Sequence, residues 1–240
     1  MVSEKVSPEQ VQVLEKLKLS NSDSNLTFNE SVDATQYLSE LNRFQEMYFK
    51  KDLEFDMENF EQEWDNAVTK INPAKLSLPD AELWFRINGT LMQLTGEAKY
   101  ATEMQQILFH GFAPENDTEY NEIEELVKPY VFTKNVDHIH LNLYTPAEIE
   151  YEHTMHGKVK IWQETDFPDA ETITVNFSLE KENYIEISLR IPDWAEGATI
   201  TVLGVKYPAH PDSYTVIAKK WHEGDKIEIR FPNIQKMAEL

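Results

Sequence analysis

The first residues in this chain whose types and spacing suggest chemistry are histidines. His138 and His140 stand two positions apart in the alternating stretch HIHLNLYTPAE, so both would point to one face of a strand. His153 and His156 could lie on a neighbouring strand, and neutral imidazoles gathered in this way bind zinc or nickel. We favour the alternative that His138 and His140 face solvent, opposite the apolar residues of the same strand. The sequence therefore predicts no metal site.

Paired carboxylates are the second kind of candidate, because most glycosidases use two of them. Glu61, Glu63, Glu82 and Glu97 fall in the half of the chain that reads as helical, where a sugar cleft would lie. However, the chain holds 43 Asp and Glu among its 240 residues, so that close pairs arise by chance. We therefore assign no catalytic residue.

Tryptophans are the third kind, since a sugar ring can stack on the apolar face of an indole. Trp162 alternates with Ile161 in a strand-like stretch and is predicted to face outwards, which makes it the candidate carbohydrate contact. Trp84 is predicted to fill a helical core instead. Trp194, in the segment RIPDWAEG, is predicted to close one end of a β-sandwich.

Charge and cysteine content exclude several classes of function. The net charge is −21, which argues against nucleic acid and anionic membrane surfaces as partners. The chain has no cysteine, so it cannot form disulfides, thiolate zinc sites, iron–sulfur clusters or a cysteine nucleophile. No glycine-rich phosphate loop is present either, and we predict no cofactor. The segment MVSEKVSPEQ lacks the pattern of a signal peptide, and no apolar run is long enough to span a bilayer.

The spacing of apolar residues differs between the two halves of the chain, and it predicts the helices and strands that position these candidate residues. Up to about residue 128, apolar residues recur at helical spacing in five or six segments, among them 32–51 and 56–71. Beyond Pro129 the period changes to two, in about eight short strands separated by turn signals. The sequence predicts an α+β protein, with an α-helical domain at 1–128 and an antiparallel β-sandwich at 129–240.

Four motifs in the β half carry a resemblance to a known family. HIHLNLYTPAE, VKIWQETDFP, ISLRIPDWAEGATITVLG and KKWHEGDKIEIRFP occur in this order. Together they resemble the region that follows the catalytic barrel in β-L-arabinofuranosidase-type glycoside hydrolases, a large bacterial family. Upstream, LTGEAKYATEMQQILFHG is similar to the helix pair before the active-site loop of that family. The resemblance covers about residues 79–232 and implies that the helical half is a partial α/α barrel.

The catalytic residues that the resemblance implies are missing from this chain. The family is understood to use a cysteine nucleophile held at a zinc ion by three cysteines and a glutamate. One pair of these ligands would fall near Ser77, Leu78 and Pro79, and adjacent cysteines would fall in APENDTEYNEIEELVKPYVFTK. Because no cysteine stands at either place, neither the nucleophile nor the zinc is expected. The barrel of the family also has about a dozen helices, twice the number predicted here.

Three functions remain compatible with the sequence. We favour a non-catalytic relative of the β-L-arabinofuranosidases, which binds a plant-type or glycoprotein-derived oligosaccharide or supports a partner enzyme. One alternative is an active glycosidase with paired carboxylates. The other is a structural or interaction module without a small-molecule site, bound to a partner protein or to copies of itself. The resemblance implies a bacterial protein, periplasmic or secreted if a signal peptide has been removed and cytoplasmic otherwise.

Overall fold

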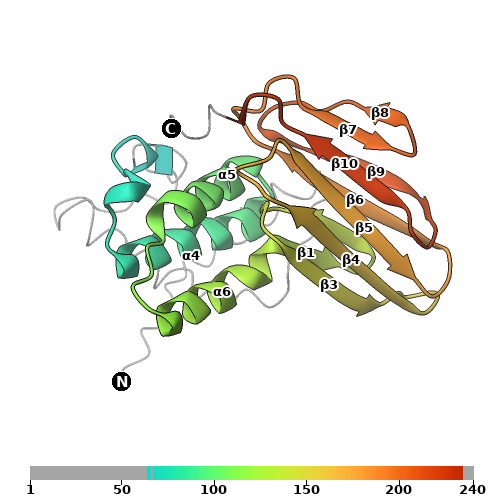
Figure 1. The fold of residues 1–240 in the computed structure, drawn as a ribbon, viewed down its shortest axis with the longest axis horizontal. Coiled ribbons are helices and arrows are strands. Elements are labelled where there is room, and N and C mark those ends of the chain that lie inside the picture. The colour runs from blue at the N-terminus through green and yellow to red at the C-terminus, as the bar shows by residue number, and fades with distance from the viewer. Residues whose placement is uncertain (1–63, 66, 235–240) are drawn as a thin grey trace, which may run out of the picture. The chain divides into compact units, whose positions relative to one another are not determined.

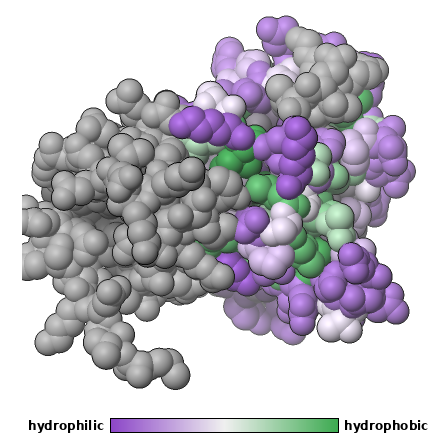
Figure 2. Space-filling view, turned by 90° about the vertical axis from the view of Figure 1, so that its left-hand side faces the viewer, coloured by the Kyte–Doolittle hydropathy of each residue, from purple (hydrophilic) through white to green (hydrophobic). Residues whose placement is uncertain are grey.

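The computed structural model describes residues 64, 65 and 67–234 (Figure 1). The chain forms two compact units, Met1–Pro114 and Glu115–Leu240. The helix predicted at 32–51 and most of the helix predicted at 56–71 lie outside the described residues, as do Glu61 and Glu63. None of the described helices is long and apolar enough to cross a membrane. In Figure 2, most of the described residues at the rim of the molecule are hydrophilic.

The first unit is helical where it is described. The 3₁₀-helix η2 (Pro73–Lys75) precedes α4 (Leu78–Thr95), which is followed by α5 (Ala98–Gln106) and the π-helical turn η3 (Ile107–Gly111). Ser77 caps α4, because its hydroxyl accepts a hydrogen bond from the backbone N–H of Asp80. Gly96 ends α4 in the left-handed conformation, at a φ of 73°.

Aromatic side chains form the core of this unit. Trp84 is fully buried, as predicted, and its indole nitrogen donates to Oε1 of Glu103 at 2.9 Å. The ring of Trp64 stands edge-on to Tyr100, with their centroids 4.9 Å apart. These helices confirm a helical region before the strands, whereas a partial α/α barrel stays a prediction.

The second unit begins with α6 (Asp117–Val131), whose N-terminus is capped by the side chain of Asn116. Because α6 runs directly into the first strand, it spans the domain boundary predicted between residues 128 and 129. That boundary stays a prediction, which limited proteolysis would test. The strands are β1 (Phe132–Asn135), β2 (His138–Leu141), β3 (Ala147–Glu152), β4 (Lys158–Thr165), β5 (Thr172–Leu179), β6 (Asn183–Ile191), β7 (Thr199–Val202), β8 (Val205–Tyr207), β9 (Ser213–Trp221) and β10 (Lys226–Arg230).

The ten strands form two sheets. One has four strands in the order β1-β2-β6-β9, and the other has six in the order β3-β4-β5-β10-β7-β8. All pairings are antiparallel except that of β2 with β6, which is parallel. Phe177 of the six-stranded sheet stacks on Trp221 of the four-stranded sheet, with 4.0 Å between ring centroids, so the sheets pack face to face. The predicted α+β class with antiparallel-rich sheets is confirmed.

Alternation places the apolar residues between the sheets. Ile139, Ile187 and Ile217 are partners across three strands, and each is at most 1% exposed. At one end of the sheets, Trp194 stacks on Phe167, with centroids 6.2 Å apart, and meets the edge of Phe231. Trp194 therefore closes this end of the sandwich, as its sequence context predicted.

The turn between β3 and β4 depends on a glycine. Gly157 has a φ of +64°, and an added Cβ would lie 2.7 Å from Oε2 of Glu180. We expect Gly157→Ala to lower the free energy of unfolding by about 1–2 kcal/mol from the backbone conformation, with a further loss from the contact. Gly204→Ala is the matched control, because its φ is +80° and nothing lies within 4 Å of the new Cβ. Equal losses in urea unfolding would contradict a role for the Glu180 contact.

Candidate functional site

The histidines lie in two separate places. His138 and His140 are both on β2, on the same face of the four-stranded sheet, as their spacing predicted. His153 and His156 lie in the turn between β3 and β4, which belong to the six-stranded sheet. Among the described residues, no three or more histidine, aspartate and glutamate side chains come close enough together to hold a metal ion.

The prediction that His138 and His140 face solvent is wrong. They do lie opposite Ile139 and Leu141, but His140 is only 5% exposed, and neither of its ring nitrogens has a hydrogen-bond partner among the described residues. His138 lies beside it, with ring centroids 4.2 Å apart, and shares a 2.9 Å hydrogen bond with Oγ of Ser188. Alternation along a strand predicts which face of the sheet a side chain lies on, but not whether other residues bury it there. Here the ring of Tyr214 of β9 stands edge-on to His140, with 6.0 Å between ring centroids.

Burial of His140 makes the stability of the protein depend on pH. Burial, and then the charge of His138, lower the pKa of His140 from 6.5 to about 3. Between pH 6.5 and 3 the unfolded chain therefore binds a proton that the folded chain does not, and the free energy of unfolding falls as the pH falls. From pH 7 to 5 we expect this residue to account for a loss of about 2 kcal/mol.

Urea unfolding of His140→Leu at pH 7 and pH 5 measures this effect. The variant is expected to lose less stability between the two pH values than the wild type does. His210→Gln is the control, because it removes an exposed histidine and keeps the buried one. An equal pH dependence of wild type and His140→Leu would show that His140 does not cause it.

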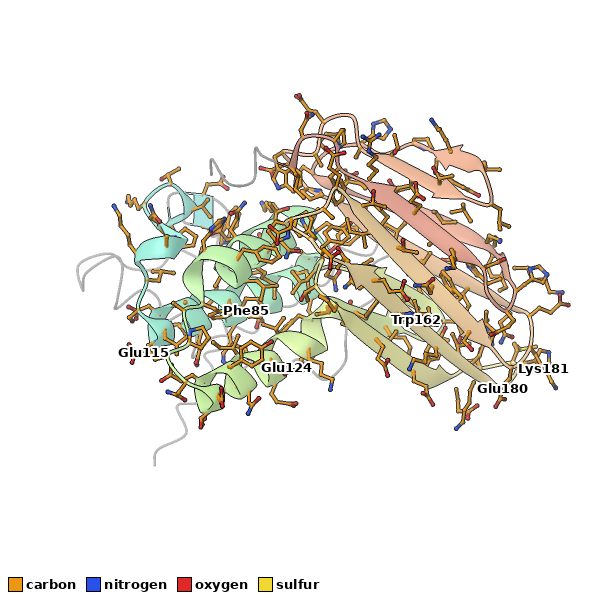
Figure 3. All side chains as sticks on the ribbon, viewed as in Figure 1. Phe85, Glu115, Glu124, Trp162, Glu180 and Lys181 are labelled. Carbon is orange, nitrogen blue, oxygen red and sulfur yellow. The ribbon has the colours of Figure 1, made fainter. Side chains whose placement is uncertain are left out.

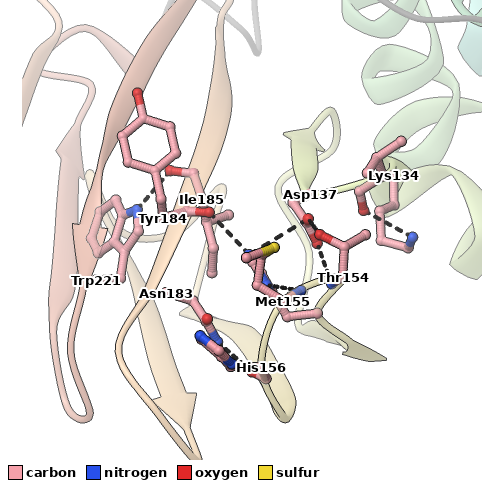
Figure 4. Close-up of polar contacts among 11 residues, drawn as sticks. Lys134, Asp137, Thr154, Met155, His156, Asn183, Tyr184, Ile185 and Trp221 are labelled. Atoms are coloured by element: carbon pink, nitrogen blue, oxygen red, sulfur yellow. Dashed lines mark hydrogen bonds and ion pairs between the residues drawn. The ribbon is translucent and has the colours of Figure 1, made fainter.

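His153 contacts Met155 of its own turn, Asp137 of the turn between β1 and β2, and Tyr184 of β6, three residues that Figure 4 labels. Its Nδ1 accepts a hydrogen bond from the backbone N–H of Met155 at 3.1 Å, and its Nε2 lies 3.0 Å from the carbonyl oxygen of Tyr184. The same Nε2 is 3.6 Å from Oδ2 of Asp137, a residue of the turn between β1 and β2. A nitrogen that accepts carries no proton, so the proton of the neutral ring is on Nε2. His153 is thus a structural link between turns of both sheets.

Beside His140 lies a buried polar network that the sequence did not reveal. Arg190 of β6 has no exposed surface, and its Nε donates to the carbonyl oxygen of Asn142. The side chain of Asn142 accepts from the hydroxyl of Tyr214 at 2.8 Å and donates to the carbonyl oxygen of Tyr130 at 3.0 Å. Burial lowers the pKa of Arg190, and nearby tyrosine and aspartate groups oppose that change. The one sequence feature that could have indicated this network is an arginine within the apolar run ISLRIP.

Trp162 has the position that the sequence predicted. It lies in the middle of β4 on the outer face of the six-stranded sheet, between Ile161 and Gln163, which point inwards (Figure 3). The half-buried indole donates from Nε1 to Oε1 of Glu164 at 3.1 Å. Its partners across the neighbouring strands are Glu148 of β3 and Asn176 of β5.

We call the outer face of this sheet around the indole the Trp162 face, defined by Glu148, Lys160, Trp162, Glu164, Thr174, Asn176 and Lys226. The pairing of the strands brings these residues together from four adjacent strands, β3, β4, β5 and β10. Nζ of Lys160 lies 2.7 Å from Oε2 of Glu148. Among the strand residues of the outer face, acidic and basic side chains are equal in number, five of each, namely Glu148, Glu150, Glu152, Glu164 and Glu228 against Lys158, Lys160, Lys206, Lys226 and Arg230. Two carboxylates from adjoining loops are added to these, since Glu171 lies beside Arg230 and Glu223 accepts a hydrogen bond from Ser178. This face is therefore closer to electrical balance than the chain as a whole.

The carboxylates considered from the sequence form no described pair. Glu82 lies in α4 and Glu97 just before α5, each half-buried, and Oε2 of Glu97 lies 2.9 Å from Nζ of Lys99. Glu61 and Glu63 lie outside the described residues. The structure thus adds no argument for a carboxylate mechanism in the first unit.

Comparison with known proteins shows which family the second unit resembles. Residues 138–233 match the family model described as the middle domain of GH127 β-L-arabinofuranosidases. The predicted resemblance to the β-L-arabinofuranosidase-type family is confirmed over this part of the chain. No curated protein matches the sequence.

Solved structures show the same fold. A glycoside hydrolase, a GH127 β-L-arabinofuranosidase from Geobacillus stearothermophilus T6 and a second GH127 β-arabinofuranosidase each match 63% of this chain, with 22% sequence identity and a TM-score of 0.54. The match covers only 31–32% of the length of those proteins. The likeness at this identity concerns the fold, and function must be argued from the residues of this chain.

Proposed function

We propose that this chain is a non-catalytic relative of the β-L-arabinofuranosidases that binds carbohydrate at the Trp162 face. The observation that carries the proposal is the position of Trp162, a half-exposed indole in the middle of an otherwise polar outer sheet face. The absence of cysteine removes the thiolate chemistry that the family resemblance implies. The confirmed relation to carbohydrate-active enzymes makes a sugar the expected ligand.

The chemistry of the Trp162 face suits a sugar. A sugar ring has an apolar C–H surface that can stack on an indole, and hydroxyl groups at its edge that need hydrogen-bond partners. Carboxylates of Glu148 and Glu164 flank the indole and can accept hydrogen bonds from such hydroxyls. Because Nε1 of Trp162 donates to Glu164, this hydrogen bond restricts the orientations of the ring before a ligand arrives.

We further propose that the ligand is a plant-type or glycoprotein-derived oligosaccharide, and that the chain assists a partner enzyme or assembles with itself. A bacterial source, with export if a signal peptide has been removed, follows from the family resemblance. A non-catalytic role predicts no release of nitrophenol from nitrophenyl β-L-arabinofuranoside. Steady release, lost when a single glutamate is changed to glutamine, would show an active glycosidase instead.

A glycan array of plant-type and glycoprotein-type oligosaccharides, followed by titration of the bound compounds, tests the binding proposal. We expect Trp162→Ala to weaken binding at least tenfold, because it removes the stacking surface. Tyr184→Ala is the matched control, since Tyr184 is an aromatic residue, 56% exposed, that lies at the start of β6 in the other sheet. Binding that Trp162→Ala leaves unchanged would overturn the assignment of this face.

A further inference from the structure

Asn176 is an unusual residue on the Trp162 face. It lies on the outer side of β5 but is only 3% exposed, and its amide nitrogen Nδ2 has no hydrogen-bond partner among the described residues. Folded proteins rarely leave a buried amide without an acceptor, because the group has lost its bonds to water and gained none in return. The buried N–H group therefore needs an explanation.

The register shows what surrounds this amide. Trp162 and Lys226 are the partners of Asn176 on the two neighbouring strands, so the three side chains form one row across β4, β5 and β10. Along β5 itself the neighbours on the same face are Thr174 and Ser178, which are small. The large side chains directly opposite the amide are those of Trp162 and Lys226, while Lys160, Glu164 and Glu228 lie on the diagonals. A shift of Trp162 or Lys226 would open the amide to a ligand.

The charges around the row indicate which ligand fits. The basic side chains of this outer face do not outnumber its acidic ones, Lys160 is paired with Glu148, and the chain as a whole has a net charge of −21. An anionic sugar such as a uronate would gain no net attraction here, because the field of the chain repels it. A neutral sugar offers hydroxyl and ring oxygens, which accept hydrogen bonds without a charge.

We propose that Asn176 is the hydrogen-bond donor of a site for neutral sugars on the Trp162 face. The sugar ring stacks on Trp162, displaces the indole slightly, and accepts a hydrogen bond from Nδ2 of Asn176. This inference rests on the proposed carbohydrate binding and deepens it, since it names the residue that recognises the sugar and the class of the sugar.

The test is an NMR titration of the ¹⁵N-labelled full chain with methyl β-L-arabinofuranoside, with galacturonic acid as the anionic comparison. In the wild type, the side-chain resonances of Asn176 and the indole resonance of Trp162 are expected to move together with the neutral sugar. Asn176→Ala is expected to raise the dissociation constant about tenfold. Its melting temperature should not fall greatly, since Nδ2 of Asn176 has no hydrogen-bond partner among the described residues. Thr201→Ala, on β7 of the same sheet but outside the Trp162 face, should change the dissociation constant less than twofold.

The possible results separate this inference from the proposal on which it rests. If Trp162→Ala abolishes binding and Asn176→Ala leaves it unchanged, the face binds sugar but Asn176 is not the donor. If neither variant changes the affinity, or no glycan binds at all, carbohydrate binding at this face fails as well. A stronger response to galacturonic acid would overturn the assignment to neutral sugars. Asn176→Ser provides a second small variant without the amide, in case Asn176→Ala does not fold.

Discussion

Replacing Trp221 with alanine is expected to lower the free energy of unfolding by about 3–5 kcal/mol. Trp221 lies at the end of β9, has no exposed surface, and stacks on Phe177 of the other sheet at 4.0 Å. Its indole nitrogen also donates to the carbonyl oxygen of Ile185 at 3.0 Å, which alanine would leave without this donor. Since whole domains are stable by about 5–15 kcal/mol, this single change removes a large share of the total.

Urea unfolding, followed by far-UV circular dichroism, measures the effect. Trp221→Phe keeps a ring against Phe177 and loses the hydrogen bond, so we expect a loss of about 1–2 kcal/mol. Val216→Ala is the control on the same strand, because Val216 is 47% exposed and should change stability by about 0.5 kcal/mol or less. A loss for Trp221→Ala as small as that of the control would show that this stack does not hold the sheets together.

Removal of the buried arginine is expected to have the second large effect. Arg190→Ala should lower the free energy of unfolding by about 3–5 kcal/mol, because it removes a large, fully buried side chain together with its hydrogen bond. The guanidinium lies 5.1 Å from the centre of the Tyr144 ring, and the hydroxyl of Tyr144 donates to the carbonyl oxygen of Arg190. Alanine would leave a cavity at this position and an unpaired carbonyl oxygen on Asn142.

Arg190→Met separates packing from charge. Methionine fills most of the space without a buried charge. The free energy of unfolding lost in Arg190→Met should therefore be less than half of that lost in Arg190→Ala. Equal losses for the two variants would mean that the hydrogen bond of Arg190 to Asn142, and not its volume, stabilises the sheet. Thermal unfolding of all variants is measured at one fixed pH, so that the pH-dependent contribution of His140 to stability is the same in each.

The four-stranded and six-stranded sheets thus have different outer faces. The outer face of the four-stranded sheet buries a network around His140 and Arg190, whose loss is expected to reduce stability. The outer face of the six-stranded sheet carries Trp162 half-exposed among polar side chains and is where we propose that carbohydrate binds. Stability experiments should therefore respond to changes in the buried network of the first face, and binding experiments to changes around Trp162 on the second.

Much of the second unit could be predicted from local sequence. The alternation of apolar and polar residues predicted that the chain forms strands beyond Pro129. It also predicted that Trp162 faces outwards, because successive side chains of a strand point to opposite sides. The ordered motifs from HIHLNLYTPAE onwards predicted the family that the match at residues 138–233 confirms. The predicted boundary between residues 128 and 129 falls inside α6, which runs from Asp117 to Val131.

What the sequence by itself determined is therefore the class of fold, the resemblance of the β unit to a known family, the outward position of Trp162 and the absence of cysteine. These depend on residue types and on spacings within one segment. The burial of His140, the network of Arg190 and the unpartnered amide of Asn176 were decided only by the tertiary structure. Each depends on neighbours that strand pairing brings from distant parts of the chain, such as Ser188 beside His140 through the parallel pairing of β2 with β6.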